Sequence, residues 1–140
     1  MVIGFVSIVT IHLVAGIKSI RQLRCEQKQI EKDYHFICAF SDIKEGEGRT
    51  ICIDDQNIAL FKHQNQVYAV DSICRHQLGP LGEGKIVDGC ITCPWHGYQY
   101  LPHNGQSPPP FSEKLSTYEV KVVNQKICLN PMPLTKGTPI

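Results

Sequence analysis

A chain of 140 residues has room for one domain of ordinary size and a short extension, because compact domains usually contain about 100 to 150 residues. Its 14 basic and 13 acidic residues give a formal net charge of +1, so the overall balance gives no reason to expect nucleic acid as a partner. The length also leaves no room within this polypeptide for a second full domain.

The first predicted element is an apolar helix. Residues 1–17 contain no charged side chain and are apolar on all sides, which favours a membrane-spanning helix at the lower edge of the roughly 17 to 25 residues required. A cleaved signal peptide is the weaker alternative, because no basic residue precedes the apolar run. The last helix of a larger membrane protein is a third interpretation. His12 within this run is interpreted as a neutral side chain bonded to a neighbouring helix, with a cofactor contact as the alternative.

A polar stalk is expected to follow. Residues 19–33 lack glycine and proline and are rich in helix-forming polar residues. A basic cluster follows the apolar run: Lys18, Arg21, Arg24 and Lys28. Basic residues beside a membrane span stay on the cytoplasmic side, so we predict that residues 1–33 anchor the chain and that the rest faces the cytoplasm.

Beyond Asp33 the pattern changes to short runs rich in Val and Ile, separated by turn residues. The expected strands cover residues 35–39, 50–53, 58–61, 67–70, 85–87, 91–92, 118–122 and 126–129. Turn residues at 46–48, 54–57 and 63–66 predict hairpin connections. About eight or nine short strands predict an all-β fold, a small antiparallel barrel or sandwich over residues 34–130, followed by a tail over 131–140.

Two short motifs carry the most specific chemistry. The first is Cys74-Arg75-His76 and the second is Cys93-Pro94-Trp95-His96, and each follows a predicted strand. Two thiolates and two imidazoles complete the ligand set of a [2Fe-2S] cluster in which two histidines replace two cysteines on one iron. The same four donors also satisfy a tetrahedral zinc ion. Spacing and flanking glycines favour the iron–sulfur cluster over zinc.

With Gly79-Pro80-Leu81-Gly82-Glu83-Gly84 after the first motif and Gly97-Tyr98-Gln99-Tyr100 after the second, the chain resembles the Rieske-type iron–sulfur domain, in particular its ferredoxin branch. The resemblance implies one [2Fe-2S] cluster, with Cys74 and Cys93 on the inner iron. His76 and His96 would bind the outer iron near the surface, where the electron leaves.

The resemblance also implies a close fit of the backbone around the cluster. Gly79, Pro80 and Gly97 would allow the two loops to pass near the bridging sulfides and offer N–H donors to them. Residues 107–111, with Pro109 at their centre, resemble the proline loop that covers the cluster in this family. Respiratory members of the family add a cysteine to each ligand loop and form a disulfide, which this sequence cannot do.

Two tyrosines after the second motif bear on the reduction potential. Tyr100 occupies the position where similar high-potential domains place a tyrosine bonded to a ligand sulfur. Tyr98 stands where they place a serine bonded to a bridging sulfide. A missing donor disfavours the reduced state, so we predict a potential in the lower part of the Rieske range of about −150 to +300 mV.

The expected function is one-electron transfer between a reductase and an acceptor protein, as a membrane-tethered ferredoxin or the ferredoxin-like module of a membrane oxidoreductase. No catalytic residue is assigned, because the chain is expected to be an electron-transfer component and not a stand-alone catalyst. A cluster-bearing sensor or interaction subunit is one alternative. The ferredoxin component of a ring-hydroxylating oxygenase system is another.

Overall fold

The computed structural model describes Ile17, Ile20 and residues 33–140. The apolar helix and stalk expected over residues 1–33 lie almost entirely outside these residues. Within the described part of the chain, no helix combines the length and the apolar character needed to cross a membrane. Residues His35–Ile140 form one compact unit. Residues 131–140 return to this unit, because the Leu134 N–H donates to the Thr117 carbonyl and the Ile140 N–H to the His103 carbonyl.

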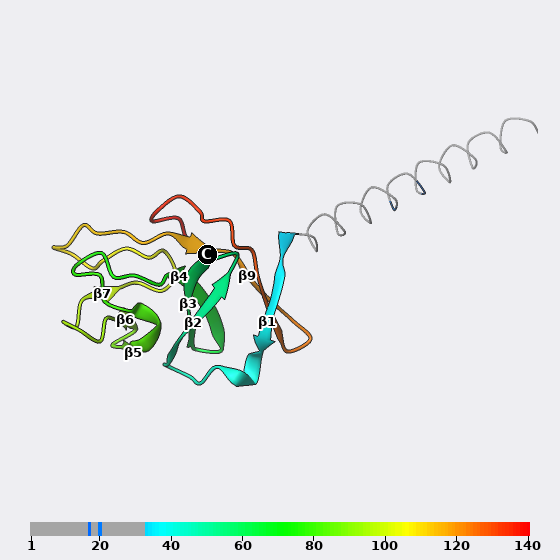
Figure 1. Cartoon of the computed structure of the whole chain (residues 1–140), viewed down its shortest axis with the longest axis horizontal. Coiled ribbons are helices and arrows are strands. Elements are labelled where there is room, and N and C mark those ends of the chain that lie inside the picture. The colour runs from blue at the N-terminus through cyan, green and yellow to red at the C-terminus, as the bar shows by residue number, and fades with distance from the viewer. Residues whose placement is uncertain (1–16, 18–19, 21–32) are drawn as a thin grey trace, which may run out of the picture. The chain divides into compact units, whose positions relative to one another are not determined.

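The compact unit is all-β and its sheets are antiparallel, as predicted. The strands are β1 (His35–Ala39), β2 (Gly48–Ile53), β3 (Gln56–His63), β4 (Gln66–Asp71), β5 (Lys85–Val87), β6 (Cys90–Thr92), β7 (Gln99–Tyr100), β8 (Thr117–Tyr118), β9 (Val120–Val123) and β10 (Lys126–Leu129). Two short 3-10 helices, η1 (Phe40–Asp42) and η2 (Leu81–Glu83), interrupt them. The sheet orders are β1-β10-β9, β2-β3-β4-β8 and β5-β6-β7. Figure 1 shows the two three-stranded sheets at opposite ends of the domain, with the four-stranded sheet between them.

Tight two-residue turns connect neighbouring strands. At each turn both central residues have positive φ, the signature of the type I′ turn that matches the twist of a hairpin. These pairs are Asp54 and Asp55, Gln64 and Asn65, Asp88 and Gly89, and Asn124 and Gln125. The turn expected over residues 54–57 is therefore shorter than predicted, since β3 already begins at Gln56.

The strand expected over residues 118–122 is two strands. Thr117 and Tyr118 form β8, which pairs with β4, whereas Val120–Val123 form β9, which pairs with β10. The chain changes sheet at Glu119, and an apolar alternation that continues across the break hides this change. β7 was not predicted as a strand because its two residues are too few to show a period.

Strand β3 is buried on both faces and separates two hydrophobic clusters. Successive side chains of a strand point to opposite faces, so Ile58 and Leu60 pack into one cluster and Ala59 and Phe61 into the other. The second cluster also contains Cys74, Cys93 and Tyr100. Both predicted ligand cysteines are thus built into a hydrophobic core that β3 supports.

Candidate metal centre

The two motifs lie on loops with the same backbone hydrogen bonds. In ligand loop 1 (residues 74–79), the Cys74 N–H donates to the Gly79 carbonyl at 2.8 Å and the Leu78 N–H to the Cys74 carbonyl at 3.0 Å. In ligand loop 2 (residues 93–98), the Cys93 N–H donates to the Tyr98 carbonyl at 2.8 Å and the Gly97 N–H to the Cys93 carbonyl at 3.0 Å. The fifth residue of each loop has positive φ, +62° at Leu78 and +69° at Gly97. The loops are therefore structural equivalents.

The four predicted ligands form one buried pair and one exposed pair. Cys74 is 1% exposed and Cys93 is 3% exposed, whereas His76 and His96 are exposed. The two imidazole rings lie 5.3 Å apart between centroids, nearly perpendicular to each other. Among the described residues, no three His, Cys, Asp or Glu side chains lie close enough together to hold a single ion.

Backbone amides stabilise the sulfur of Cys93. Burial raises the pKa of the Cys93 thiol, and the neighbouring Cys74 thiol acts in the same direction. The N–H groups of Trp95 and His96 donate to the Cys93 sulfur and act in the opposite direction. Such N–H donors also stabilise an iron-bound thiolate.

Two glycines of the ligand loops have different roles. A Cβ on Gly79 would lie 2.6 Å from Cys93 Sγ and 3.2 Å from the ring of Trp95, so only glycine lets loop 1 lie against loop 2 here. Gly97 has nothing within 4 Å of a Cβ position, and its positive φ is the reason for glycine. Pro80 closes the base of loop 1, since it pairs with Ile73 and precedes η2.

Tyr100 contacts the first ligand cysteine. Its hydroxyl lies 3.3 Å from Cys74 Sγ and accepts the Arg75 N–H at 2.9 Å. If Cys74 binds iron, its sulfur has no proton to donate, and the phenol would be the donor in this contact. Because the phenol oxygen accepts the Arg75 N–H, the proton of the phenol remains available for a hydrogen bond to Cys74 Sγ.

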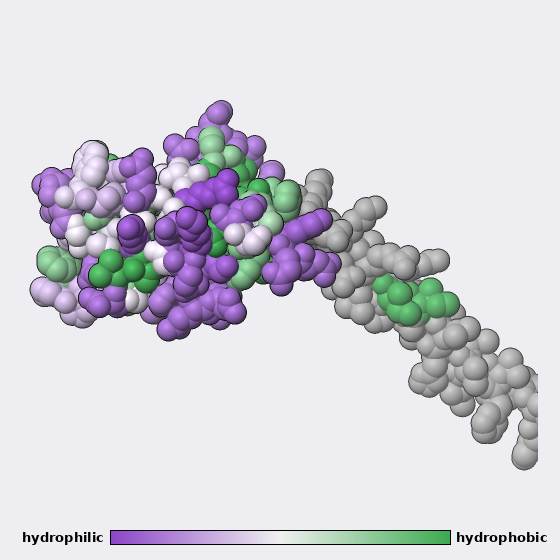
Figure 2. All heavy atoms as spheres, turned by 90° about the horizontal axis from the view of Figure 1, so that it is seen from below, coloured by the Kyte–Doolittle hydropathy of each residue, from purple (hydrophilic) through white to green (hydrophobic). Residues whose placement is uncertain are grey.

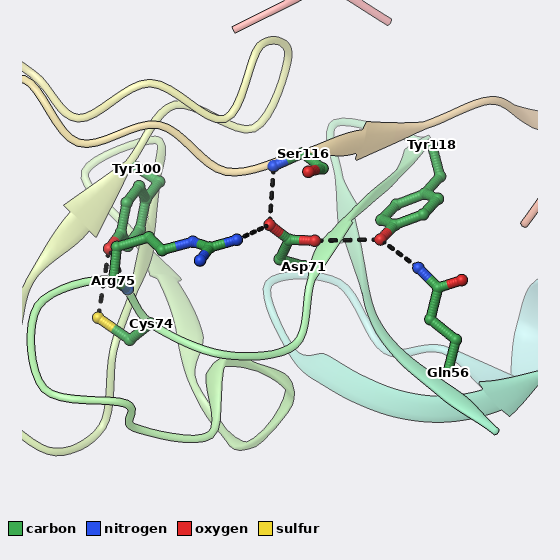
Figure 3. A network of polar contacts seen from close by, with 7 residues as sticks. All are labelled: Gln56, Asp71, Cys74, Arg75, Tyr100, Ser116 and Tyr118. Carbon is green, nitrogen blue, oxygen red and sulfur yellow. Dashed lines mark hydrogen bonds and ion pairs between the residues drawn. The ribbon is translucent and has the colours of Figure 1, made fainter. Parts of the chain in front are cut away.

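A polar network extends from this contact into the four-stranded sheet (Figure 3). The Arg75 guanidinium donates to Asp71 Oδ2 at 3.0 Å, and the same oxygen accepts the Ser116 N–H at 2.9 Å. Asp71 Oδ1 accepts the Tyr118 hydroxyl at 3.0 Å, and Tyr118 in turn accepts Gln56 Nε2 at 2.6 Å. Strand β4 and strand β8 thereby fix the start of loop 1.

Tyr98 lies between His76 and the proline loop (residues 107–111). Its ring stacks on His76 with centroids 4.9 Å apart and packs against Phe111 at 5.1 Å. Its hydroxyl donates to Glu113 Oε2. Pro109 is exposed at the turn of the proline loop, which the Phe111 N–H closes on the Pro108 carbonyl.

These residues fit a [2Fe-2S] cluster. Two sulfurs and two imidazoles in separate pairs provide two ligands for each iron, and Gly79 leaves the space beside Cys93 that a side chain would fill. The buried Ser107 hydroxyl has no hydrogen-bond partner of proper geometry among the described residues. All six cysteines of the described residues are free, so no disulfide joins the two ligand loops.

Comparison with known proteins identifies the family. A family model described as the Rieske [2Fe-2S] domain matches residues 33–119, which is more than half of the chain. The chain belongs to the Rieske [2Fe-2S] family. A Rieske domain binds one [2Fe-2S] cluster, so the cofactor predicted from the two motifs is confirmed.

Several relatives of this Rieske protein are ferredoxin components. The ferredoxin component of an alkene monooxygenase system from Xanthobacter autotrophicus is 32% identical over 112 residues, covering 79% of this chain and 90% of the relative. The ferredoxin component of a naphthalene 1,2-dioxygenase system from Pseudomonas putida is 27% identical over 93 residues, covering 66% and 89%. Ferredoxin-type one-electron transfer is thus the function of this Rieske protein.

Solved structures share the fold. The ferredoxin of carbazole 1,9a-dioxygenase from Nocardioides aromaticivorans IC177 has a TM-score of 0.65 at 20% identity, covering 71% of this chain and 98% of that chain. A complex of reduced oxygenase and oxidised ferredoxin of carbazole 1,9a-dioxygenase contains a chain with a TM-score of 0.65 at 24% identity, covering 74% and 97%.

Sequence reasoning missed three residues around the centre. Asp71 precedes Cys74 by three positions, and its i,i+4 spacing to Arg75 was a signal for an ion pair. Glu113 reaches Tyr98 across 15 positions, which no local pattern indicates. Leu78 occupies the left-handed position of loop 1, where a sequence-based expectation would have placed glycine or asparagine.

Proposed function

We propose that this Rieske protein passes single electrons from a reductase to the oxygenase component of a multicomponent oxygenase, through a cluster held by Cys74 and Cys93 on the inner iron and by His76 and His96 on the outer iron. When bound, the cluster supplies reversible one-electron redox chemistry. The observation that carries the ligand assignment is the division of the four side chains into a buried sulfur pair and an exposed imidazole pair.

The exposed pair gives the route for the electron. Because the cysteines are enclosed by the core around β3, a partner protein cannot approach the inner iron from their side. The rings of His76 and His96 are exposed at the ends of two equivalent loops. Electron exchange therefore proceeds through the imidazole edge.

Apolar side chains accompany the two histidines. Leu78 is 69% exposed on loop 1, Trp95 is 59% exposed on loop 2, and Phe111 is 57% exposed on the proline loop. The face shown in Figure 2 is mostly hydrophilic, with apolar side chains confined to small patches. A partner that covers these side chains removes water from the imidazole edge and brings its own redox centre close. A contact that rests on three exposed apolar side chains is small, which suits the transient encounter that an electron carrier requires.

The relatives support an oxygenase as the acceptor. Those from Xanthobacter autotrophicus and Pseudomonas putida are named as ferredoxin components of a monooxygenase and a dioxygenase system. A ferredoxin component implies a reductase before it and an oxygenase after it. No feature of the described residues favours a sensor subunit over this role.

The hydrogen bonds made by Tyr98 and Tyr100 support a potential in the lower part of the Rieske range. Of the two tyrosines, Tyr100 has its hydroxyl beside a ligand sulfur, whereas the Tyr98 hydroxyl is directed to Glu113. Fewer donors to the cluster sulfurs disfavour the added electron. A measured potential above about +200 mV contradicts this part of the proposal.

Ligand variants of the purified full chain test the proposal. Replacing any one of Cys74, His76, Cys93 or His96 with Ala is expected to abolish the visible spectrum and the anisotropic EPR signal of the dithionite-reduced protein. His103→Ala and Cys52→Ala are the matched controls, because both side chains are exposed and neither lies on a ligand loop. Native protein should contain two irons and two acid-labile sulfides. A normal signal in any of the four variants overturns the ligand assignment, and one zinc in place of iron overturns the cluster.

Electron flow is tested separately. The reduced protein is mixed with the oxygenase component of an alkene monooxygenase or a naphthalene dioxygenase, and its reoxidation is followed in a stopped-flow spectrometer. Reoxidation that saturates with oxygenase concentration, and that slows when Trp95 is replaced with Ala, supports the acceptor. No reoxidation by either class of oxygenase overturns it.

We further propose a membrane anchor in residues 1–17, with the cluster domain in the cytoplasm, because this run lacks charge and is followed by basic residues. Fractionation of cells that express the full chain tests it. The native chain is expected with the membranes, and a variant with Ile8→Asp and Val9→Asp in the soluble fraction. A native chain found in the soluble fraction refutes the anchor.

A further inference from the structure

Three loops meet at the exposed end of the centre, and one side chain contacts all of them. Tyr98 is the last residue of ligand loop 2, where its carbonyl accepts the Cys93 N–H. Its ring stacks nearly parallel on His76 of ligand loop 1, with an interplanar angle of 10°. Its hydroxyl reaches Glu113, just beyond the proline loop. Tyr98 thus joins elements that are distant in sequence.

Glu113 is held in this position from several directions. Its Oε2 also accepts the Ser112 N–H at 3.2 Å, and its carbonyl accepts the Ser107 N–H at 2.9 Å. The second of these bonds closes the proline loop at its base. When the Tyr98 hydroxyl binds the Glu113 carboxylate, the closed proline loop is tied to the ring that covers His76.

The carboxylate is also electrostatically coupled to the centre. It accepts the hydroxyl of Tyr98, whose ring stacks on His76 with centroids 4.9 Å apart, so its charge lies one side chain away from an outer-iron ligand. The hydrogen bond from Tyr98 is the main cause that lowers the pKa of Glu113, so this carboxyl is ionised near neutral pH. A fixed negative charge beside a ligand of the outer iron opposes the arrival of an electron.

We propose that Tyr98 and Glu113 form a positioning pair that fixes the imidazole plane of His76, ties the proline loop over the cluster and lowers the reduction potential through the Glu113 charge. The pair rests on the proposed function, since His76 matters to the potential only as an iron ligand. It assigns a role to the hydroxyl that Tyr98 donates to Glu113.

Two substitutions separate the hydrogen bond from the charge. Glu113→Gln keeps an oxygen that accepts the Tyr98 hydroxyl but removes the charge, so the potential is expected to rise while the proline loop stays closed. Tyr98→Phe keeps the stacked ring but removes the hydroxyl, so the Ser107 and Phe111 N–H groups are expected to exchange with solvent several-fold faster. In Tyr98→Phe the reduced protein should also show shifted EPR g values, because His76 is held less firmly.

The controls repeat each chemical change away from the centre. Tyr68→Phe removes a hydroxyl that donates to Gln66 on strand β4. Glu45→Gln changes a carboxylate that accepts the Gln64 N–H. The potential and g values of both controls should equal those of the native protein.

The measurements are redox titration, EPR of the reduced full chain, and hydrogen exchange in both loaded and cluster-free protein. If Glu113→Gln leaves the potential within the spread of the two controls, the charge has no role and the proposal fails. Unchanged exchange of the Ser107 N–H in Tyr98→Phe refutes the tie to the proline loop. Should Tyr98→Phe not fold, Glu113→Gln still decides the charge. A native protein without a cluster signal would instead refute the proposed function.

Discussion

Replacing Tyr100 with Phe tests how the core controls the potential. The substitution removes one hydroxyl from a fully buried ring and changes little else in the packing of the second hydrophobic cluster. It eliminates the contact with Cys74 Sγ at 3.3 Å and the acceptor for the Arg75 N–H at 2.9 Å. The first loss is expected to lower the reduction potential, and the second to lower the free energy of unfolding.

The magnitude follows from the charge on the sulfur. A hydrogen bond to a charged group contributes about 1.5 to 3 kcal/mol, and a gain of about 1 kcal/mol on reduction corresponds to about 40 mV for a one-electron couple. We therefore expect Tyr100→Phe to lower the potential by about 40 mV, since the reduced cluster loses more than the oxidised one. The Arg75 N–H left without its acceptor should reduce the free energy of unfolding by about 1 kcal/mol.

A redox titration monitored by visible absorption measures the shift, and Tyr118→Phe is the matched control. Tyr118 is also a buried tyrosine with two hydrogen bonds, but these join Asp71 and Gln56 and not a ligand sulfur. The control should lose stability while its potential stays within about 10 mV of the native value, a small part of the 59 mV that a tenfold change in a one-electron equilibrium represents. Equal shifts in both variants, or no shift in Tyr100→Phe, would show that the phenol does not donate to Cys74.

Three other outcomes are expected. Gly79→Ala should prevent cluster assembly, because its Cβ would lie 2.6 Å from Cys93 Sγ. The control Gly89→Ala has open space around its Cβ and should retain full iron content. Equal iron content in the two variants would contradict the steric argument. Leu78 and Gly97 both have positive φ, a conformation that glycine adopts more easily than other residues. Urea unfolding should therefore show a higher free energy of unfolding for Leu78→Gly and a lower one for Gly97→Ala, each changed by about 0.5 to 1 kcal/mol. Shifts of the same sign would refute the equivalence of the loops. Burial, and next the Asp71 charge, raises the pKa of Tyr118 to about 12 from its ordinary 10, so the unfolded phenol ionises first. The contribution of the protonated Tyr118 to the free energy of unfolding is complete below pH 10 and declines between pH 10 and 12 by up to about 1.4 kcal/mol per pH unit. The free energy of unfolding of Tyr118→Phe should therefore fall less steeply with pH across this window than that of the native protein.

The ligand motifs were the most predictable part of the protein. Cysteine and histidine pairs at fixed spacing identify a cluster because coordination chemistry admits few alternatives. The predicted strands also match the observed ones where a strand stays in one sheet over its whole length, as in β1, β5 and β10. Local chemistry was sufficient in these places.

The unpredicted features depend on partners distant in sequence. Residues 117–122 show one apolar pattern, yet the chain leaves one sheet and enters another at Glu119, because β4 and β10 supply the two sets of hydrogen-bond partners. Cys52 illustrates the same limit, because it lies in an apolar run but is exposed on β2, whereas Cys38 is buried in a similar run. A strand pattern shows which side chains share a face but not what covers that face.

The equivalence of the two ligand loops explains how unequal spacings serve one centre. In identical hydrogen-bonded frames, the histidine is the second residue after the cysteine in loop 1 and the third in loop 2. The side chains therefore leave the two frames in different directions, and the imidazole rings meet at 85°. One face of His76 stacks on Tyr98, whose ring packs against Phe111, so loop 1 is linked to the proline loop through this tyrosine.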